Sequence, residues 1–463
     1  MGFKRTLFTV RIFVFAATLA IALSFSSCKQ QPLAEEPFKV EHAEWLNNAT
    51  LYEVNIRQYT PEGTFAAFEQ HLPRLKELGV DILWLMPIHP IGEVERKGTL
   101  GSYYSVQDYM GVNPEFGSMD DFKHLVSQAH DLGMKVILDW VANHCAHDNK
   151  IVEEHPDWVV RESAGNAVSP YDWTDVVQLN YANNEFRDYM ISALKYWIEE
   201  AGVDGYRCDV AFMVPTDFWN KVRKELVSLK PMFMLAEAEN VELQQFAFDA
   251  DYAWEFHSLM NEIAKGKKTV MDMDRYFQKE LATYPKNTIK MHFTSNHDEN
   301  SWHGTEFNRM GKSVKAFAAL TFTIPGIPLI YNGQEVAFDK QLEFFEKDEI
   351  SWTPNAEFTD FYKELIELKR NNTALMAGAK GADMFRVKTS NDINVFAFIR
   401  ENEQDKVFAI FNFSPLEQII DLEGEAYKGS YTELFSNDSF SFTEGSKITL
   451  TPWAFKIYIK ETP

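Results

Sequence analysis

The sequence predicts a (β/α)8 barrel with a small inserted subdomain, followed by a C-terminal antiparallel β-sandwich domain. Two patterns predict this fold: a repeated order of helix, glycine and short apolar strand, and a later change to the alternation of antiparallel strands. The chain has 463 residues, 45% of them hydrophobic and 24% charged. This composition suits a globular protein with one large and one small domain.

The repeated order is clear from the first unit onward. Residues 65–78 carry apolar side chains at helical spacing, Gly79 suits the position after a helix, and residues 82–85 form an apolar strand. The same order recurs over residues 118–139, which open on a capping-box pattern, and again before residues 203–210. Helices that alternate with buried strands predict a parallel sheet.

Eight candidate strands recur at intervals that fit a closed barrel, in which eight units average roughly 31 residues each. They lie at residues 52–55, 82–86, 136–139, 205–209, 233–237, 252–256, 289–294 and 329–331. The wider gaps after the second and third strands are typical of long loops over an active site. Residues 146–180 are expected to form the inserted subdomain.

The pattern changes at about residue 382. Residues 395–399, 407–411 and 448–450 show the alternation of antiparallel strands. We therefore expect a catalytic barrel over residues 45–375 and a β domain over residues 382–463.

The N-terminal residues resemble an export signal. Three basic residues precede an apolar run over residues 12–23, which is short for a membrane span. Small residues then precede Cys28, and the junction resembles the lipobox of bacterial lipoproteins, although Phe25 replaces the usual leucine. We expect a signal peptide over residues 1–27, a lipid on Cys28 that anchors the exported protein to the cell envelope, and a tether over residues 28–44. Cleavage nearby, giving a free secreted protein, is the alternative.

Charge and cysteine content exclude some partners. The formal net charge is −23, and the chain has no cluster of Lys and Arg with which to replace phosphate counterions, so nucleic acid is not expected as a partner. Besides Cys28 only Cys145 and Cys208 occur, too few for a disulfide framework or a cysteine-rich metal site. One bridge between them is an alternative to the favoured pair of buried free thiols.

Three carboxylates stand where predicted strands end. Asp209, Glu237 and Asp298 are separated by 28 and 61 residues, close to one and two βα units. They would therefore lie on strands four, five and seven of one rim, the face that carries active sites in such barrels. A single carboxylate of this kind is more often a helix cap or a surface charge, but three carboxylates in a shared register indicate one site.

Converging carboxylates are suited to glycosidic cleavage. One protonates the departing oxygen and a second attacks the anomeric carbon when the two lie about 5 to 5.5 Å apart, which retains configuration. A third carboxylate would raise the pKa of the acid through repulsion. Arg207, on the same strand face as Asp209, is expected to keep that nucleophile ionised.

The sequence resembles the α-amylase family, glycoside hydrolase family thirteen, over nearly the whole predicted mature chain. Four motifs carry the resemblance: residues 139–144, residues 205–209, the strand that ends at Glu237, and residues 296–298. Residues 333–335, after the eighth strand, also fit the family. The resemblance implies a barrel enzyme that acts on α-glucosidic bonds.

The resemblance also implies a role for each matching residue. Asp209 would be the nucleophile, Glu237 the general acid/base, and Asp298 the carboxylate that distorts and holds the sugar. The residues expected around the attacked glucose are His144, Arg207 and His297. Tyr104 lies in a segment similar to the one whose tyrosine stacks under that glucose, and a flat aromatic face suits a pyranose. A core role is the alternative for Tyr104.

Eleven tryptophans occur in the chain, and most are expected to pack in the interior. The candidates for additional sugar contacts are Trp140, Trp158, Trp173 and Trp302.

The chain departs from the family at its structural calcium site. Many members use an Asn of the first motif, an Asp before strand four and a His four residues after the nucleophile. Here Asn143 fits, but Gln178 and Met213 occupy the other positions. A hard cation needs several oxygen ligands, so we expect this calcium site to be absent and no cofactor to be required.

The expected activity is hydrolysis of starch or maltooligosaccharides by double displacement at an envelope surface. α-1,6-Glucosidase activity is one alternative, because Val210 occurs with that specificity in some relatives. Glucan transglycosylation by the same site is another. A non-catalytic glucan-binding surface protein is the alternative of a different class, which the presence of all three carboxylates disfavours.

Overall fold

The computed structural model describes residues 40–460. The predicted signal peptide, Cys28 and most of the tether lie outside these residues, and they stay predictions. Across the part that is described, none of the helices combines the length and the apolar character that crossing a membrane requires.

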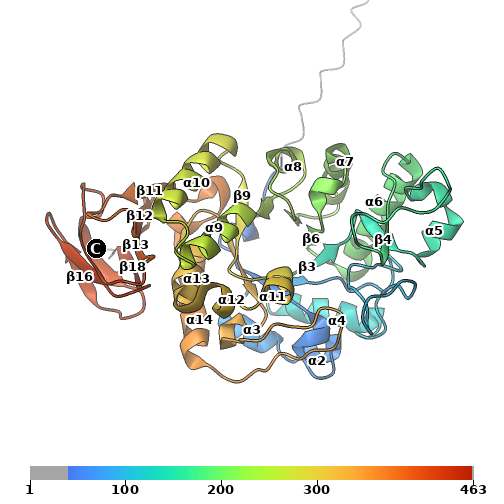
Figure 1. Cartoon of the computed structure of the whole chain (residues 1–463), viewed down its shortest axis with the longest axis horizontal. Coiled ribbons are helices and arrows are strands. Elements are labelled where there is room, and N and C mark those ends of the chain that lie inside the picture. Colours follow the sequence, from blue (N-terminus) through green and yellow to red (C-terminus); the bar gives the residue numbers. More distant parts are fainter. Residues whose placement is uncertain (1–39, 461–463) are drawn as a thin grey trace, which may run out of the picture. The chain divides into compact units, whose positions relative to one another are not determined.

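Eight parallel strands form a closed barrel, which confirms the predicted fold (Figure 1). They are β1 (Leu51–Val54), β2 (Ile82–Leu85), β3 (Lys135–Trp140), β6 (Gly205–Cys208), β7 (Phe233–Ala236), β8 (Ala250–Tyr252), β9 (Ile289–His292) and β10 (Ile327–Tyr331). Around the barrel the strands follow in chain order, and β10 closes the ring by pairing with β1. The prediction for β8 was wrong in extent, because residues 254–256 begin a helix whose buried side chains recur at helical spacing.

Helices surround the barrel. They are α1 (Ile56–Tyr59), α2 (Phe65–Glu69), α3 (Leu72–Leu78), α4 (Met119–Asp131), α6 (Asn184–Ala201), α7 (Thr216–Val227), α8 (Val241–Phe246), α9 (Trp254–Ala264), α10 (Val270–Thr283), α11 (His297–His303), α12 (Glu306–Met310), α13 (Val314–Thr323) and α14 (Ala356–Asn371). The helix expected over residues 65–78 is two helices, because Pro73 requires a new first turn. Gly79 ends α3 with φ of 105°, and Ser118 and Asp121 form the predicted capping box of α4.

The loop after β3 contains the predicted insertion. Its strands β4 (His144–Ala146) and β5 (Val176–Gln178) pair antiparallel, and α5 (Lys150–Glu154) lies between them in the sequence. This hairpin fixes the positions of His144 at one strand and of the residues that precede the other.

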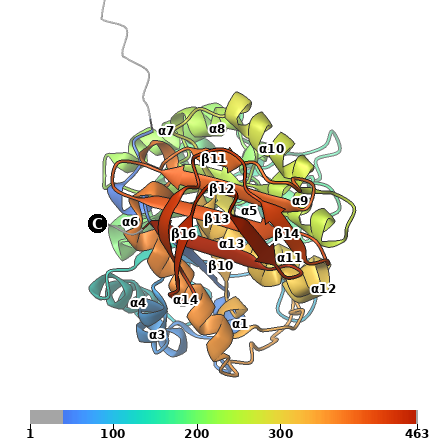
Figure 2. The same cartoon turned by 90° about the vertical axis from the view of Figure 1, so that its left-hand side faces the viewer.

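The C-terminal strands form two antiparallel sheets, one of six strands and one of two, that share a core (Figure 2). The strands are β11 (Met384–Val387), β12 (Val395–Glu401), β13 (Lys406–Asn412), β14 (Gln418–Asp421), β15 (Gly429–Glu433), β16 (Ser439–Phe442), β17 (Lys447–Leu450) and β18 (Phe455–Lys460). Aromatic pairs connect this domain to the barrel helices, with Phe317 of α13 stacked 4.6 Å from Phe413. The predicted C-terminal antiparallel domain is therefore present.

Candidate active site

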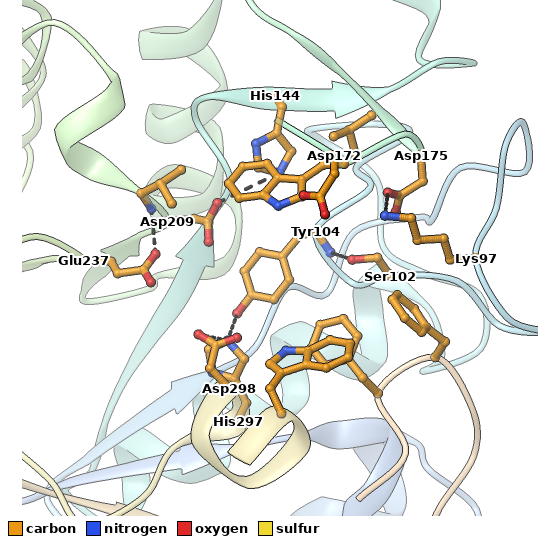
Figure 3. Close-up of a pocket in the computed structure, with 16 residues that line it drawn as sticks. Lys97, Ser102, Tyr104, His144, Asp172, Asp175, Asp209, Glu237, His297 and Asp298 are labelled. Atoms are coloured by element: carbon orange, nitrogen blue, oxygen red, sulfur yellow. Dashed lines mark hydrogen bonds and ion pairs between the residues drawn. The ribbon is translucent and has the colours of Figure 1, made fainter. Parts of the chain in front are cut away.

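The three predicted carboxylates line one cavity at the carboxyl ends of the barrel strands (Figure 3). Asp209 directly follows β6, Glu237 directly follows β7, and Asp298 is the second residue of α11, which comes after β9. The neighbouring strands β6 and β7 are in register, with Cys208 opposite Ala236, so the residues that follow them lie side by side. The cavity has a volume of 380 Å³.

Arg207 connects the carboxylates. Its guanidinium lies 3.1 Å from Asp209 Oδ1, 2.9 Å from Glu237 Oε2 and 2.8 Å from Asp139 Oδ1. Asp139, on β3, also accepts a hydrogen bond from the hydroxyl of Tyr104 at 3.0 Å. Because one buried cation contacts both Asp209 and Glu237, these two side chains face the same small volume.

Burial and repulsion determine how this cluster titrates. Burial and the charge of Glu237 raise the pKa of Asp209 well above its ordinary value. Burial raises the pKa of Glu237, and the charge of Asp298 adds to this effect as expected. Arg207 lowers both pKa values, but burial and repulsion outweigh it, which differs from the expectation that Arg207 keeps Asp209 ionised. Burial and mutual repulsion therefore make it harder to ionise both carboxyl groups at once, which suits a site that needs one acid and one carboxylate.

The backbone turns at Val210, so that the N–H of this residue faces the side chain of Glu237. Its φ of 36° is left-handed, which is unusual for a β-branched residue. In this conformation its N–H donates to Glu237 Oε2 at 2.7 Å. The strained turn thus holds one oxygen of the proposed acid/base, a contribution that the sequence does not reveal.

Tyr104 and His297 form a stacked pair in the cavity. Their ring centroids lie 5.4 Å apart at 21°, and the Tyr104 hydroxyl lies 2.7 Å from His297 Nε2. Asp298 Oδ2 is 3.3 Å from the same nitrogen, and His297 Nδ1 hydrogen-bonds to the buried carboxylate of Glu53 on β1. Glu53 was not predicted, because a single polar residue in an apolar strand gives no sign of a partner across the barrel.

His144 borders the same cavity from β4. Its Nε2 lies 3.9 Å from Asp209 Oδ2, and its ring is 5.2 Å from that of Trp173. Burial lowers the pKa of His144 to about 4, so the ring is neutral at pH 7 and can donate a hydrogen bond from one nitrogen.

Several lining residues come from loops and were not predicted as site residues. They are Lys97, Ser102, Asp172, Asp175, Phe344 and Phe345, and Val176 at the start of β5 also lines the cavity. Of the four tryptophans that were candidates for sugar contacts, Trp173 and Trp302 line the cavity. The other two do not: Trp140 packs on His89, and Trp158 stacks on His155. Loops have no periodic pattern, so the sequence does not indicate which of their residues face the site.

The described residues contain no group of three or more His, Cys, Asp or Glu side chains that could hold a metal ion. Calcium also binds amide and carbonyl oxygens, so the absence of the family calcium site stays a prediction. Cys145 and Cys208 are buried and free, as favoured from the sequence.

Comparisons with known proteins show similarity to amylases. The family model described as alpha amylase, catalytic domain, matches residues 43–174 and 154–386, and the maltogenic amylase C-terminal domain matches residues 385–457. An alpha-amylase from Dictyoglomus thermophilum is 25% identical over 86% of this chain and 74% of its own.

Two solved structures are similar over 90% of this chain and 100% of theirs. A noncanonic maltogenic alpha-amylase from Thermotoga neapolitana is 30% identical with a TM-score of 0.84. An alpha-amylase from Lactobacillus plantarum is 33% identical with a TM-score of 0.81.

Proposed function

Because the chain belongs to the α-amylase family of glycoside hydrolases, we propose that it hydrolyses α-1,4 bonds of maltooligosaccharides or starch and retains configuration. The observation that supports this proposal is the contact of one guanidinium, that of Arg207, with both Asp209 and Glu237 inside a single cavity. Two carboxyl groups held in this way are suited to double displacement.

In the first step Glu237 transfers its proton to the glycosidic oxygen while Asp209 attacks the anomeric carbon. The bond between that carbon and the leaving oxygen breaks, and a glycosyl ester forms on Asp209. In the second step Glu237 takes a proton from water, the resulting hydroxyl attacks the anomeric carbon, and the ester bond breaks. Both carboxyl groups then return to their initial states.

The remaining lining residues would position the sugar. Tyr104 offers an aromatic face beneath the pyranose, while His144, His297 and Asp298 offer hydrogen bonds to its hydroxyl groups. Arg207 is buried behind the carboxylates and acts by holding them. The position of the four lining residues around one cavity supports these proposed roles.

An amide at the nucleophile tests the proposal. Asp209→Asn should lower kcat for maltoheptaose by at least about 10³-fold, because the amide cannot form the ester. Glucan binding should persist, as measured by calorimetry. The matched control is Glu357→Gln, a carboxylate-to-amide change at an exposed pair with Lys315, which should leave kcat unchanged. Equal turnover by the Asp209→Asn protein and the wild type would reject the mechanism.

The wild-type protein also tests which linkage is cleaved and whether the reaction is hydrolysis or transglycosylation. We expect cleavage of maltoheptaose and little cleavage of isomaltotriose, which carries α-1,6 bonds. Activity on isomaltotriose alone would reassign the linkage. Products longer than a maltotriose substrate, seen by thin-layer chromatography, would instead indicate transglycosylation.

A further inference from the structure

The proposed chemistry determines which end of the cavity holds the reducing side of a bound glucan and which end holds its non-reducing side. Asp209 attacks the anomeric carbon, and Glu237 protonates the oxygen that leaves from it, so the leaving group lies on the Glu237 side. Lys97 and Asp175 lie on the opposite side of Tyr104 from Glu237 (Figure 3). The non-reducing end of a bound glucan therefore points toward Lys97 and Asp175.

An ion pair bounds this end of the cavity. Lys97 Nζ lies 2.9 Å from Asp175 Oδ1, and both residues line the cavity. Lys97 comes from the loop after β2, whereas Asp175 directly precedes β5 of the insertion, so the pair spans two separate segments. The Asp175 side chain is only 6% exposed and that of Lys97 is 34% exposed.

The loop that carries Lys97 is held on both sides. Arg96 donates to the carbonyl oxygens of Ile91 and Gly92 at 3.0 and 2.8 Å. Further along, the N–H of Leu100 donates to the carbonyl oxygen of Phe345 at 3.1 Å, and Phe345 itself lines the cavity. The ion pair is thus part of a fixed boundary, because both flanks of the loop are tied to the protein.

The backbone beside Asp175 is also tied down. Its carbonyl oxygen accepts a hydrogen bond from Ser105 Oγ at 2.9 Å. Thr174, the preceding residue, offers its carbonyl oxygen to His147 Nε2 at 3.0 Å. Both partners of the ion pair therefore sit on segments that other contacts already fix.

We propose that Lys97 and Asp175 close the non-reducing end of the cavity and bind the terminal hydroxyl groups of the glucan, so that the enzyme releases short maltooligosaccharides from non-reducing chain ends. This inference rests on the proposed hydrolysis of α-glucans. An ammonium donates to one sugar hydroxyl while a carboxylate accepts from its neighbour, so the two charges together match a sugar terminus.

An internal glucose unit cannot satisfy this pair in the same way. Its O4 carries a glycosidic bond in place of a hydroxyl, so it has no proton to donate there, and the next unit would need the space that the ion pair occupies. Sites built to hydrogen-bond a hydroxyl discriminate strongly against ligands that lack it. Chain ends should therefore be preferred to chain interiors.

Maltoheptaose labelled at its reducing end tests the proposal, used both free and with its non-reducing terminal hydroxyls blocked. For the wild type we expect labelled products that shorten stepwise, and blocked substrate that is cleaved at least about 100-fold more slowly. In Lys97→Ala this preference should fall at least about tenfold, and short labelled fragments from internal cleavage should appear in the earliest samples, before stepwise shortening could produce them.

Two further variants keep the result interpretable. Lys97→Met retains the length of the side chain without its charge and should also lose at least about tenfold of the preference, even if Lys97→Ala folds poorly. Lys123→Ala removes a Lys–Glu200 pair of similar length on the outer helices and should behave as the wild type.

Equal cleavage of free and blocked substrate by the wild type would overturn the inference and leave the hydrolase assignment intact. An unchanged preference in both Lys97 variants would also overturn it. A wild type that cleaves neither substrate would instead overturn the proposed function, and the inference with it.

Discussion

Glu53 controls the charge of a residue in the site without lining the cavity itself. Its carboxylate accepts a hydrogen bond from His297 Nδ1, and its Oε2 has no hydrogen-bond partner among the described residues. Burial lowers the pKa of His297, but the charges of Asp298 and Glu53 raise it to about 9 against the opposing charge of Arg207. His297 is therefore an imidazolium at neutral pH, with a proton on each ring nitrogen.

Glu53→Gln should move the alkaline limb of the pH profile of kcat/KM. Removing the negative charge lowers the pKa of His297, so the imidazolium is lost at a lower pH, by roughly one pH unit. The acidic limb should stay in place, because the carboxylates near Arg207 remain. A uniform fall in kcat/KM with no shift of the alkaline limb would assign Glu53 a purely structural role.

The sequence was informative about some site residues and silent about others. Asp209, Glu237 and Asp298 could be predicted because each lies shortly after a strand in a regular series. Lys97 and Glu53 could not: the position of Lys97 depends on an irregular loop, and the partner of Glu53 is determined only when the first and last strands close the barrel.

At the scale of single elements, Asp204 anchors β6, the strand that leads to Asp209. Its buried carboxylate accepts hydrogen bonds from His130 Nε2 at 2.7 Å, from Lys230 Nζ at 2.8 Å and from the N–H of Val136 at 2.9 Å. Burial raises its pKa, but these hydrogen bonds outweigh burial and lower the pKa to about 2. The start of β6 is thus tied to α4, to β3 and to the segment after α7.

Asp204→Asn should lower the free energy of unfolding by about 2 kcal/mol at pH 7, as the difference between the folded pKa and an ordinary value near 4 implies. Because the folded pKa is the lower one, this contribution is present above pH 4 and is lost as the pH falls through about 2. Urea unfolding at pH 7 and at the lowest pH where both proteins fold should show the deficit shrinking. An equal deficit at both pH values would contradict this account.

Helix boundaries were harder to predict than helices. The apolar spacing of residues 65–78 was correct on both sides of the break, yet Pro73 divides the segment into α2 and α3. For β8 the apolar run continued into α9, because a strand and a buried helix turn carry the same residue types. The apolar pattern identified the segments, but Pro73 and the packing of α9 set the two boundaries that the pattern missed.

At the scale of the whole molecule, Arg400 of β12 connects the C-terminal domain to the barrel. Its guanidinium donates to the carbonyl oxygens of Ile324 at 3.1 Å, Met376 at 3.0 Å and Ala382 at 3.0 Å. The alternating pattern predicted β12, but it gave no sign that this arginine crosses to the end of α13. Burial lowers the pKa of Arg400 to about 9, so the guanidinium is still charged at pH 7.

Arg400→Met should destabilise both domains together. Methionine retains much of the apolar stem, but it leaves several buried carbonyl groups without donors, which costs about 3 kcal/mol or more. For a cooperative unit of this size, that loss corresponds to a fall in Tm of about 3 °C. Calorimetry should show one transition at the lower temperature. Arg275→Met, at an exposed pair with Asp272, should leave Tm unchanged. Two separate transitions, with the barrel transition unmoved, would show that the domains unfold independently and that Arg400 stabilises only its own sheet.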